Sequence, residues 1–185
     1  AISRGLAQLL TPSRRVVYVL SGHGEFDPED RGPDGMSELV AALDQERYDT
    51  EKLDLLRSNR EGELPTVPDD AAVVLVPRPT KALTPAEEDT LLAWIGRGGA
   101  VLWAMDVGRP VPNTVERMGF SVTNGVALQA QMQVPYRDRP IPVLKTHAVT
   151  NPIREEKLAV ILAHPAPLRL ADPAPDGVKA QALLT

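Results

Sequence analysis

Residues 16–25 read Val-Val-Tyr-Val-Leu-Ser-Gly-His-Gly-Glu, and this stretch decides the fold. The continuous apolar run over residues 16–20 is typical of a strand that is buried on both faces of a sheet. The run stops at Ser21, and the loop that follows places His23 and Glu25 beside two glycines. In an open α/β sheet, ligands bind at the carboxyl ends of the strands. The loop therefore does chemistry, binds a ligand or only turns the chain.

The rest of the chain continues the alternation of strands and helices. Apolar runs predict further strands over residues 48–55, 71–76 and 100–105, and helical spacing predicts helices that begin at Ser37 and after Thr84. This order is typical of a mostly parallel sheet with helices on both faces, so we expect a three-layer α/β fold. Right-handed crossovers would then place the loops 21–34, 77–83 and 106–111 along one edge of the sheet.

The helix after residue 84 has the clearest start signal in the chain. Thr84 is a suitable N-cap, Pro85 fits the first helical position, and Glu87 stands where a capping box needs its carboxylate. The sequence Gly-Arg-Gly-Gly at 96–99 predicts the end of the helix, because glycine adopts the left-handed conformation of a C-cap.

We expect three regions along the chain. Helically spaced apolar residues predict a helical lead-in over 1–13, the α/β domain follows over 14–165, and 166–185 reads as a proline-rich tail. Within the domain, residues 123–165 are expected to complete the sheet with an irregular β-rich portion that ends in an apolar strand over 158–162.

Composition excludes several classes of function. The net charge of −5 and the isoelectric point near 5.2 argue against a nucleic-acid partner, which needs a basic surface. The absence of cysteine excludes disulfides, thiolate metal sites and a cysteine nucleophile. There is no membrane-spanning apolar run and no signal-peptide pattern. The chain begins at Ala1 without methionine, so we expect a piece of a longer protein whose flanks carry targeting or membrane segments.

Two interpretations of the first loop stay open. Gly22 and Gly24 would let backbone N–H groups approach a ligand, while His23 and Glu25 would supply a base and a carboxylate. Alternatively, the glycines only allow the bend, the histidine bonds a neighbouring loop, and the glutamate acts as a cap. The candidate ligand-binding residues are Ser21, Gly22, His23, Gly24, Glu25, Arg78 and Asp106.

No catalytic residues are assigned. The strand end at 76–79 reads Val-Pro-Arg-Pro and offers no nucleophile, and the chain has no Gly-x-Ser-x-Gly elbow. Ser21 could pair with His23, but the sequence around Ser21 lacks the motif of a serine hydrolase, so we do not expect one. Asp106, just after an expected strand, is either a ligand carboxylate or a cap, and we favour the cap.

We expect neither a metal nor a cofactor. The three histidines lie far apart without zinc-motif spacing, although His23, Glu25 and His147 would form a site if their loops met. The loop lacks the lysine of a phosphate-binding motif. The acidic stretch 25–30 would attract a cation, but such a run is more often a solvated loop.

Five blocks carry a resemblance to a known family. They are 17–25 with its Ser-Gly-His-Gly-Glu, the strand end at Pro77, Leu-Thr-Pro-Ala-Glu at 83–87, 94–102 with its Gly-Gly strand entry, and 147–153. Together they resemble the auxiliary domain of an uncharacterised bacterial ABC transport system, of the gliding-motility type. The resemblance implies a fold like the class I glutamine amidotransferase and flavodoxin group, and kinship with a domain of an intraflagellar-transport subunit. It supplies no catalytic residues.

The resemblance also implies a function and a place in the cell. We expect a non-catalytic, extracytoplasmic (periplasmic or cell-surface) domain, held by membrane segments outside these residues. Its partners would be ABC transporter permease or ATPase subunits, envelope proteins or an envelope ligand. Two alternatives stay open: an enzyme that acts through the Gly-His-Gly-Glu loop on a small carbonyl or glycan substrate, and a structural assembly module.

Overall fold

The computed structural model describes residues 15–32, 35–57, 66–131 and 136–185. The chain forms two compact units, Ala1–Met105 and Asp106–Thr185. The helical lead-in expected over 1–13 lies outside the described residues, and the expected domain boundaries near 13 and 165 stay predictions.

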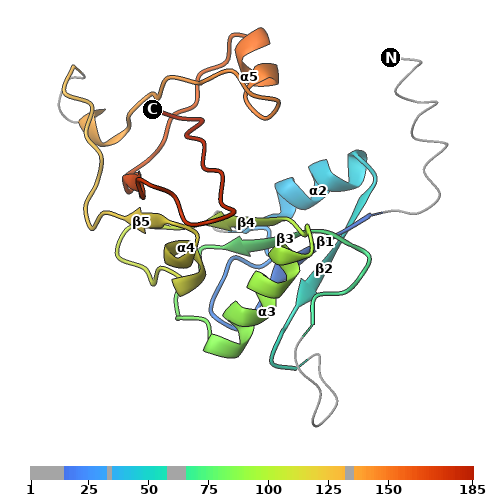
Figure 1. The fold of residues 1–185 in the computed structure, drawn as a ribbon. Helices are drawn as coiled ribbons and strands as arrows, with labels where there is room; N and C mark the ends of the chain where they lie inside the picture. Colours follow the sequence, from blue (N-terminus) through green and yellow to red (C-terminus); the bar gives the residue numbers. More distant parts are fainter. Residues whose placement is uncertain (1–14, 33–34, 58–65, 132–135) are drawn as a thin grey trace. The chain divides into compact units, whose positions relative to one another are not determined.

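The first unit is built on a parallel four-stranded sheet in the order β2-β1-β3-β4 (Figure 1). Its strands are β1 (Arg15–Leu20), β2 (Tyr48–Leu53), β3 (Ala71–Pro77) and β4 (Val101–Ala104). β1 pairs with β2 on one side and with β3 on the other, so the chain changes direction across the sheet between β1 and β3. The carboxyl ends of these two strands therefore form the topological switch point, where α/β folds of this kind bind ligands.

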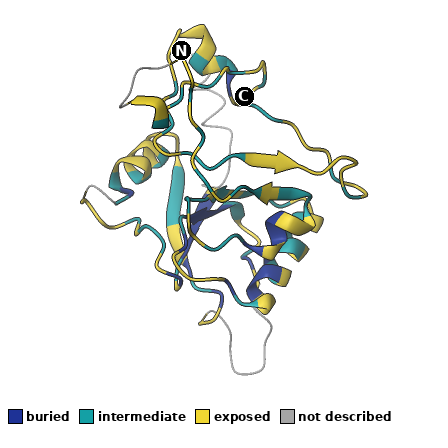
Figure 2. Ribbon diagram, turned by 90° about the vertical axis from the view of Figure 1, so that its left-hand side faces the viewer, coloured by how far each residue is buried: buried dark blue, intermediate teal, exposed yellow. Residues whose placement is uncertain are grey.

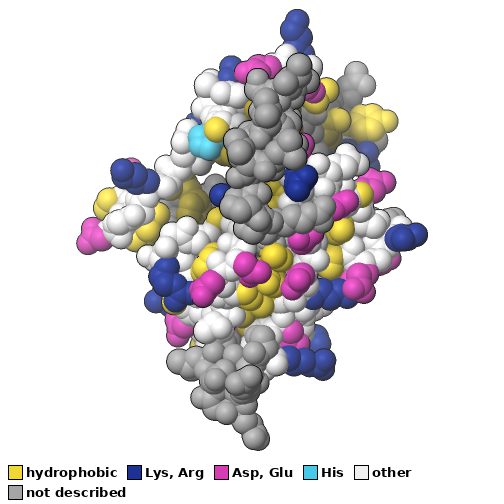
Figure 3. All heavy atoms as spheres, turned by 90° about the vertical axis from the view of Figure 1, so that its right-hand side faces the viewer, with side chains coloured by type: hydrophobic (Ala, Val, Ile, Leu, Met, Phe, Trp, Pro, Cys, Tyr) yellow, Lys and Arg dark blue, Asp and Glu magenta, His cyan; other side chains and the backbone are white. Residues whose placement is uncertain are grey.

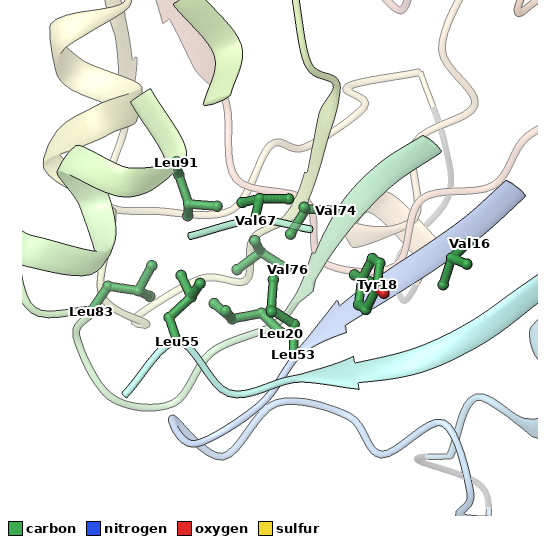
Figure 4. Packing of buried hydrophobic residues seen from close by; sticks show 10 residues of the cluster. All are labelled: Val16, Tyr18, Leu20, Leu53, Leu55, Val67, Val74, Val76, Leu83 and Leu91. Carbon is green, nitrogen blue, oxygen red and sulfur yellow. The ribbon is translucent and has the colours of Figure 1, made fainter. Parts of the chain in front are cut away.

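Two helices cover opposite faces of this sheet. Val17 and Val19 of β1 belong to a cluster with Met36 and Leu43, at α2 (Ser37–Gln45). The alternate β1 side chains, Val16, Tyr18 and Leu20, belong to a second cluster that extends to Leu91 of α3 (Pro85–Gly96); Figure 4 shows this cluster. Both faces of β1 are thus buried, which the apolar run predicted, and the three-layer α/β expectation is confirmed.

The start of α3 confirms the predicted capping box. The backbone N–H of Glu87 donates to Thr84 Oγ1 (3.4 Å), and the backbone N–H of Thr84 donates to Glu87 Oε2 (2.8 Å). At the other end, Gly98 has a φ of +92°, so glycine supplies the left-handed turn that ends the helix.

The predicted second strand is two residues too long. β2 ends at Leu53 because the side chain of Asp54 accepts the backbone N–H groups of Leu56 (3.0 Å) and Arg57 (3.1 Å) and turns the chain.

The second unit has little regular structure. It contains α4 (Asn113–Arg117), β5 (Phe120–Val122), the 3₁₀ turn η1 (Tyr136–Asp138), α5 (Asn151–Glu155) and β6 (Leu168–Leu170). β5 and β6 form a separate antiparallel pair. The segment 166–185, expected as a tail, thus contributes a strand.

The expectation that residues 123–165 complete the first sheet is wrong, because β4 is the last strand of that sheet in the described residues. The predicted strand over 158–162 is wrong too. Leu158 and Ile161 are 58% and 63% exposed. Lys157 and His164 flank the run with φ values of +55° and +51°, which break an extended path on both sides.

Burial differs sharply between the units (Figure 2). Fourteen of the 15 buried hydrophobic residues described belong to the first unit, and Val115 is the one in the second. No helix of the described residues combines the length and the apolar character needed to cross a membrane.

Tyr18 gives the first unit a measurable pH response. The Tyr18 hydroxyl donates to Asp70 Oδ1 (3.2 Å), and burial, followed by this hydrogen bond, raises the pKa of Tyr18 from 10.0 to about 12. The protonated phenol is favoured in the folded state, so its contribution to stability is complete below pH 10 and is lost as the pH rises towards 12. Denaturant unfolding followed over this range should show that Tyr18→Phe loses less stability than the wild type. Equal losses would contradict this.

Candidate functional site

The loop 21–25 after β1 and the loop 78–83 after β3 are joined by hydrogen bonds at the switch point. The carbonyl of His23 accepts the backbone N–H groups of Thr80 (2.9 Å) and Lys81 (3.0 Å) and the Thr80 hydroxyl (2.9 Å). The backbone N–H of Phe26 donates to the carbonyl of Pro77 (3.1 Å). Where related folds leave a crevice, this chain bridges the two loops with its own backbone.

The side chain of His23 is buried between two carboxylates. Its Nε2 lies 3.1 Å from Oε2 of Glu87, and its Nδ1 lies 3.3 Å from Oε1 of Glu25, without hydrogen-bond geometry at that second contact. The backbone N–H of His23 donates to Glu25 Oε2 (2.8 Å). The three side chains are 6%, 2% and 0% exposed for histidine, Glu25 and Glu87. We call these three residues the His23 cluster.

Glu87 links the cluster to the start of α3. Its Oε2 accepts both the backbone N–H and the hydroxyl of Thr84 (2.8 Å each), while its Oε1 is buried without a partner. The sequence predicted Glu87 as a cap but not as the partner of His23. The available signal was topological: the loop after β1 and the first turn of α3 lie at the same edge of a parallel sheet.

Gly24 lets the two loops approach closely. It has a φ of +73°, and a Cβ added there would lie 2.2 Å from Thr80 Oγ1. That hydroxyl is the group that donates to the His23 carbonyl, so the missing side chain makes room for the bond between the loops.

The remaining candidates take other roles. Ser21 Oγ donates to the carbonyl of Leu53 (3.3 Å), which gives it no part in a dyad with His23. Arg78, half-buried with a φ of +57°, has its guanidinium 5.1 Å from the ring centre of Phe26. Ser21 to Glu25 and Arg78 thus gather at one edge.

Asp106 belongs to the second unit. Its carboxylate accepts the backbone N–H of Val107 (2.8 Å), so it orders its own turn. This is a local cap rather than the N-cap of a helix.

A small open pocket of about 190 Å³ lies beside the loop. Its lining residues are Leu20, Ser21, Gly22, Gly24, Glu25, Phe26, Asp27, Pro28 and Lys52. It is smaller than the roughly 300–1,000 Å³ of typical small-molecule sites.

The acidic loop at this pocket is already neutralised in part. Lys52 Nζ lies 3.0 Å from Asp27 Oδ1 and 3.1 Å from Glu29 Oε2. The backbone N–H of Glu29, followed by the Lys52 ammonium, lowers the pKa of Asp27. The stretch thus has a cation of its own, which supports the interpretation as a solvated loop.

Histidines in the second unit have local partners. His164 Nε2 lies 2.7 Å from Asp138 Oδ2, and His147 Nδ1 accepts the backbone N–H of Val149 (3.2 Å). Among the described residues, no group of three metal-ligating side chains is placed to hold a metal ion.

The family model for an ABC-type uncharacterized transport system matches residues 14–115, more than half of the chain. The chain belongs to this family. The matched range contains both loops of the switch point and the whole His23 cluster. The family resemblance drawn from the Gly-His-Gly-Glu loop and the Leu-Thr-Pro-Ala-Glu helix start is therefore confirmed.

Among solved structures, the chain is similar to one named mmIFT52 N-terminal domain, with 16% identity and a TM-score of 0.65. The match covers 91% of this chain and 72% of that one. At this identity the similarity shows a shared fold and nothing about activity. A comparison with curated proteins gives no match.

The buried histidine should be needed for stability. His23→Ala leaves the carboxylates of Glu25 and Glu87 buried without their imidazole, so we expect a loss of about 3 kcal/mol in the free energy of unfolding. Urea denaturation measures this loss.

The matched control is the exposed histidine–carboxylate pair of the second unit. His164→Ala should cost less than about 1 kcal/mol, because His164 is largely solvated. Similar losses for the two variants would show that burial of His23 between carboxylates is unimportant.

Gly24→Ala should lower the free energy of unfolding more than Gly98→Ala does. Both glycines have a positive φ, which strains alanine by about 1–2 kcal/mol. A Cβ added at Gly98, however, would have no atom within 4 Å. The contact with Thr80 Oγ1 should add about 1–3 kcal/mol at Gly24. Thermal or urea unfolding would report the difference, and the excess should shrink when Thr80→Ala is also present. An excess that persists in that background would refute the steric explanation.

Proposed function

We propose that this chain is a non-catalytic, extracytoplasmic part of an ABC transport system and that it binds a partner protein or an envelope ligand. The observation that carries the proposal is membership of the ABC-type transport family over residues 14–115. In the loop 21–25, which belongs to the matched range, the side chain of His23 faces the protein interior.

The buried His23 cluster favours binding over catalysis. A general base must reach a substrate proton directly or through one water. In the described structure, both nitrogens of His23 face carboxylates of the same protein, and Ser21 donates to a backbone carbonyl. The cluster thus fits a role in shaping the edge.

The exposed part of that edge is the proposed binding surface. Thr80, Lys81 and Asp27 are solvent-exposed there, on loops whose backbones the His23 cluster and its hydrogen bonds hold together. A rigid edge favours binding because fewer conformations are lost on association.

The extracytoplasmic placement rests on the resemblance to the gliding-motility-type family, in which membrane segments flank such a domain. It is tested by fusing a reporter that is active only outside the cytoplasm to the full-length protein. A reporter that is active only in the cytoplasm would contradict the placement.

The partner is tested by affinity capture of the full-length protein from detergent-solubilised membranes of its own host. We expect an ABC permease and its ATPase to copurify in fixed proportion. Lys81→Glu, at the carboxyl edge, should reduce this copurification by about tenfold, as expected when charge is reversed at an interface.

The matched control is Arg97→Glu, an exposed charge reversal at the end of α3 and at the opposite edge of the sheet. It should leave copurification unchanged. Purification free of any transport component would overturn the proposed function, and equal effects of both variants would overturn the proposed edge.

A further inference from the structure

The second unit exposes most of the large hydrophobic side chains. Of the 14 large hydrophobic side chains described as exposed, 11 lie in the second unit. Of the 15 buried hydrophobic residues, only Val115 lies there. Contiguous exposed apolar surface marks interaction sites in soluble proteins.

Four of these side chains lie on segments that hydrogen bonds tie together. We call them the aliphatic patch: Leu128 (65% exposed), Ile141 (43%), Val143 (68%) and Ile161 (63%).

Two hydrogen bonds connect the segments of the patch. The backbone N–H of Ile141 donates to Gln129 Oε1 (2.9 Å), next to Leu128. The N–H of Leu162 donates to the carbonyl of Pro140 (3.1 Å), which places residues 161 and 141 on adjoining segments. Val143 follows Ile141 by two residues, and it exchanges backbone hydrogen bonds of 2.7 and 3.1 Å with Thr185, which hold this segment in place. The four side chains therefore lie on adjoining segments of the second unit.

The surroundings of the aliphatic patch are basic. Arg137, Arg139 and Lys145 are exposed on the same segments, and the nearby Asp138 carboxylate is paired with His164. The positive charge is local to this unit, which has nine Lys and Arg against seven Asp and Glu, while the first unit has 11 against 18. Figure 3 shows the face on the side of α2 and β2, where Asp and Glu side chains flank a band of hydrophobic side chains.

We propose that the aliphatic patch binds an acidic polypeptide segment that carries aliphatic side chains, supplied by a protein of the transport system. This inference rests on the proposed function and specifies the chemistry of one partner. The aliphatic side chains of the segment would cover the patch, and its carboxylates would meet Arg139 and Lys145.

The backbone favours a polypeptide over a lipid surface. Around the patch the described chain is mostly irregular, with the short 3₁₀ turn η1 and an isolated antiparallel bridge between Leu144 and Leu184. Hydrocarbon would leave the remaining backbone polar groups without hydrogen bonds, whereas an incoming peptide can pair with them.

The test uses the intact chain and a short synthetic peptide in which Glu alternates with Val, followed by NMR titration. We expect shifts at Val143 and Ile161. The double variant Arg139→Glu/Lys145→Glu should bind this peptide at least about tenfold more weakly and should instead bind the matched peptide with Lys in place of Glu. Val143→Thr should weaken binding without altering the charge, and Arg97→Glu in the first unit is the control.

Three results would overturn the inference. These are equal binding of the two peptides, binding to phosphatidylcholine–phosphatidylglycerol vesicles in place of the peptide, and self-association of the chain that the double variant abolishes. Amide spectra of each variant confirm its folding before titration. Because the copurification experiment uses Lys81 at the other unit, loss of peptide binding alone would refute this inference and leave the proposed function standing.

Discussion

The contact on which the first unit depends is that of the His23 imidazole with Glu87, which joins the end of β1 to the first turn of α3. Taking a carboxylate out of water is costly unless it is compensated, and Glu87 is fully buried. Its Oε2 is compensated by Thr84 as well as by the imidazole. The same carboxylate therefore caps the start of α3 and contacts the histidine of the loop after β1.

The sequence could predict the layers of the first unit because its signals are local. The apolar run before Ser21 and the Thr84–Glu87 capping box need no knowledge of distant residues. Predicting the His23–Glu87 contact requires the order of the strands in the sheet, and hydrophobic periodicity does not give that order. The predicted set also omitted Glu87 and Lys52, although both help to shape the edge.

Prediction failed where no neighbouring element defines the structure. Residues 158–162 have the composition of a buried strand, but in the described structure Leu158 and Ile161 are exposed and pair with no strand. A short apolar run indicates that a segment favours burial, but it does not indicate which element buries it. The same excess of uncovered aliphatic residues distinguishes the second unit, and it gives that unit a chemistry unlike that of the acidic first unit.

The double use of Glu87 has a consequence for how such sequences diverge. Because one carboxylate serves both as the cap of α3 and as the partner of His23, neither motif is free to change alone. A relative that replaces the histidine with an apolar residue would bury a charge unless it also moves the cap to a shorter or neutral side chain. Loss of the Gly-His-Gly-Glu loop and loss of the Thr-Pro-x-Glu helix start should therefore occur together in the family, as paired substitutions at sites far apart in the chain.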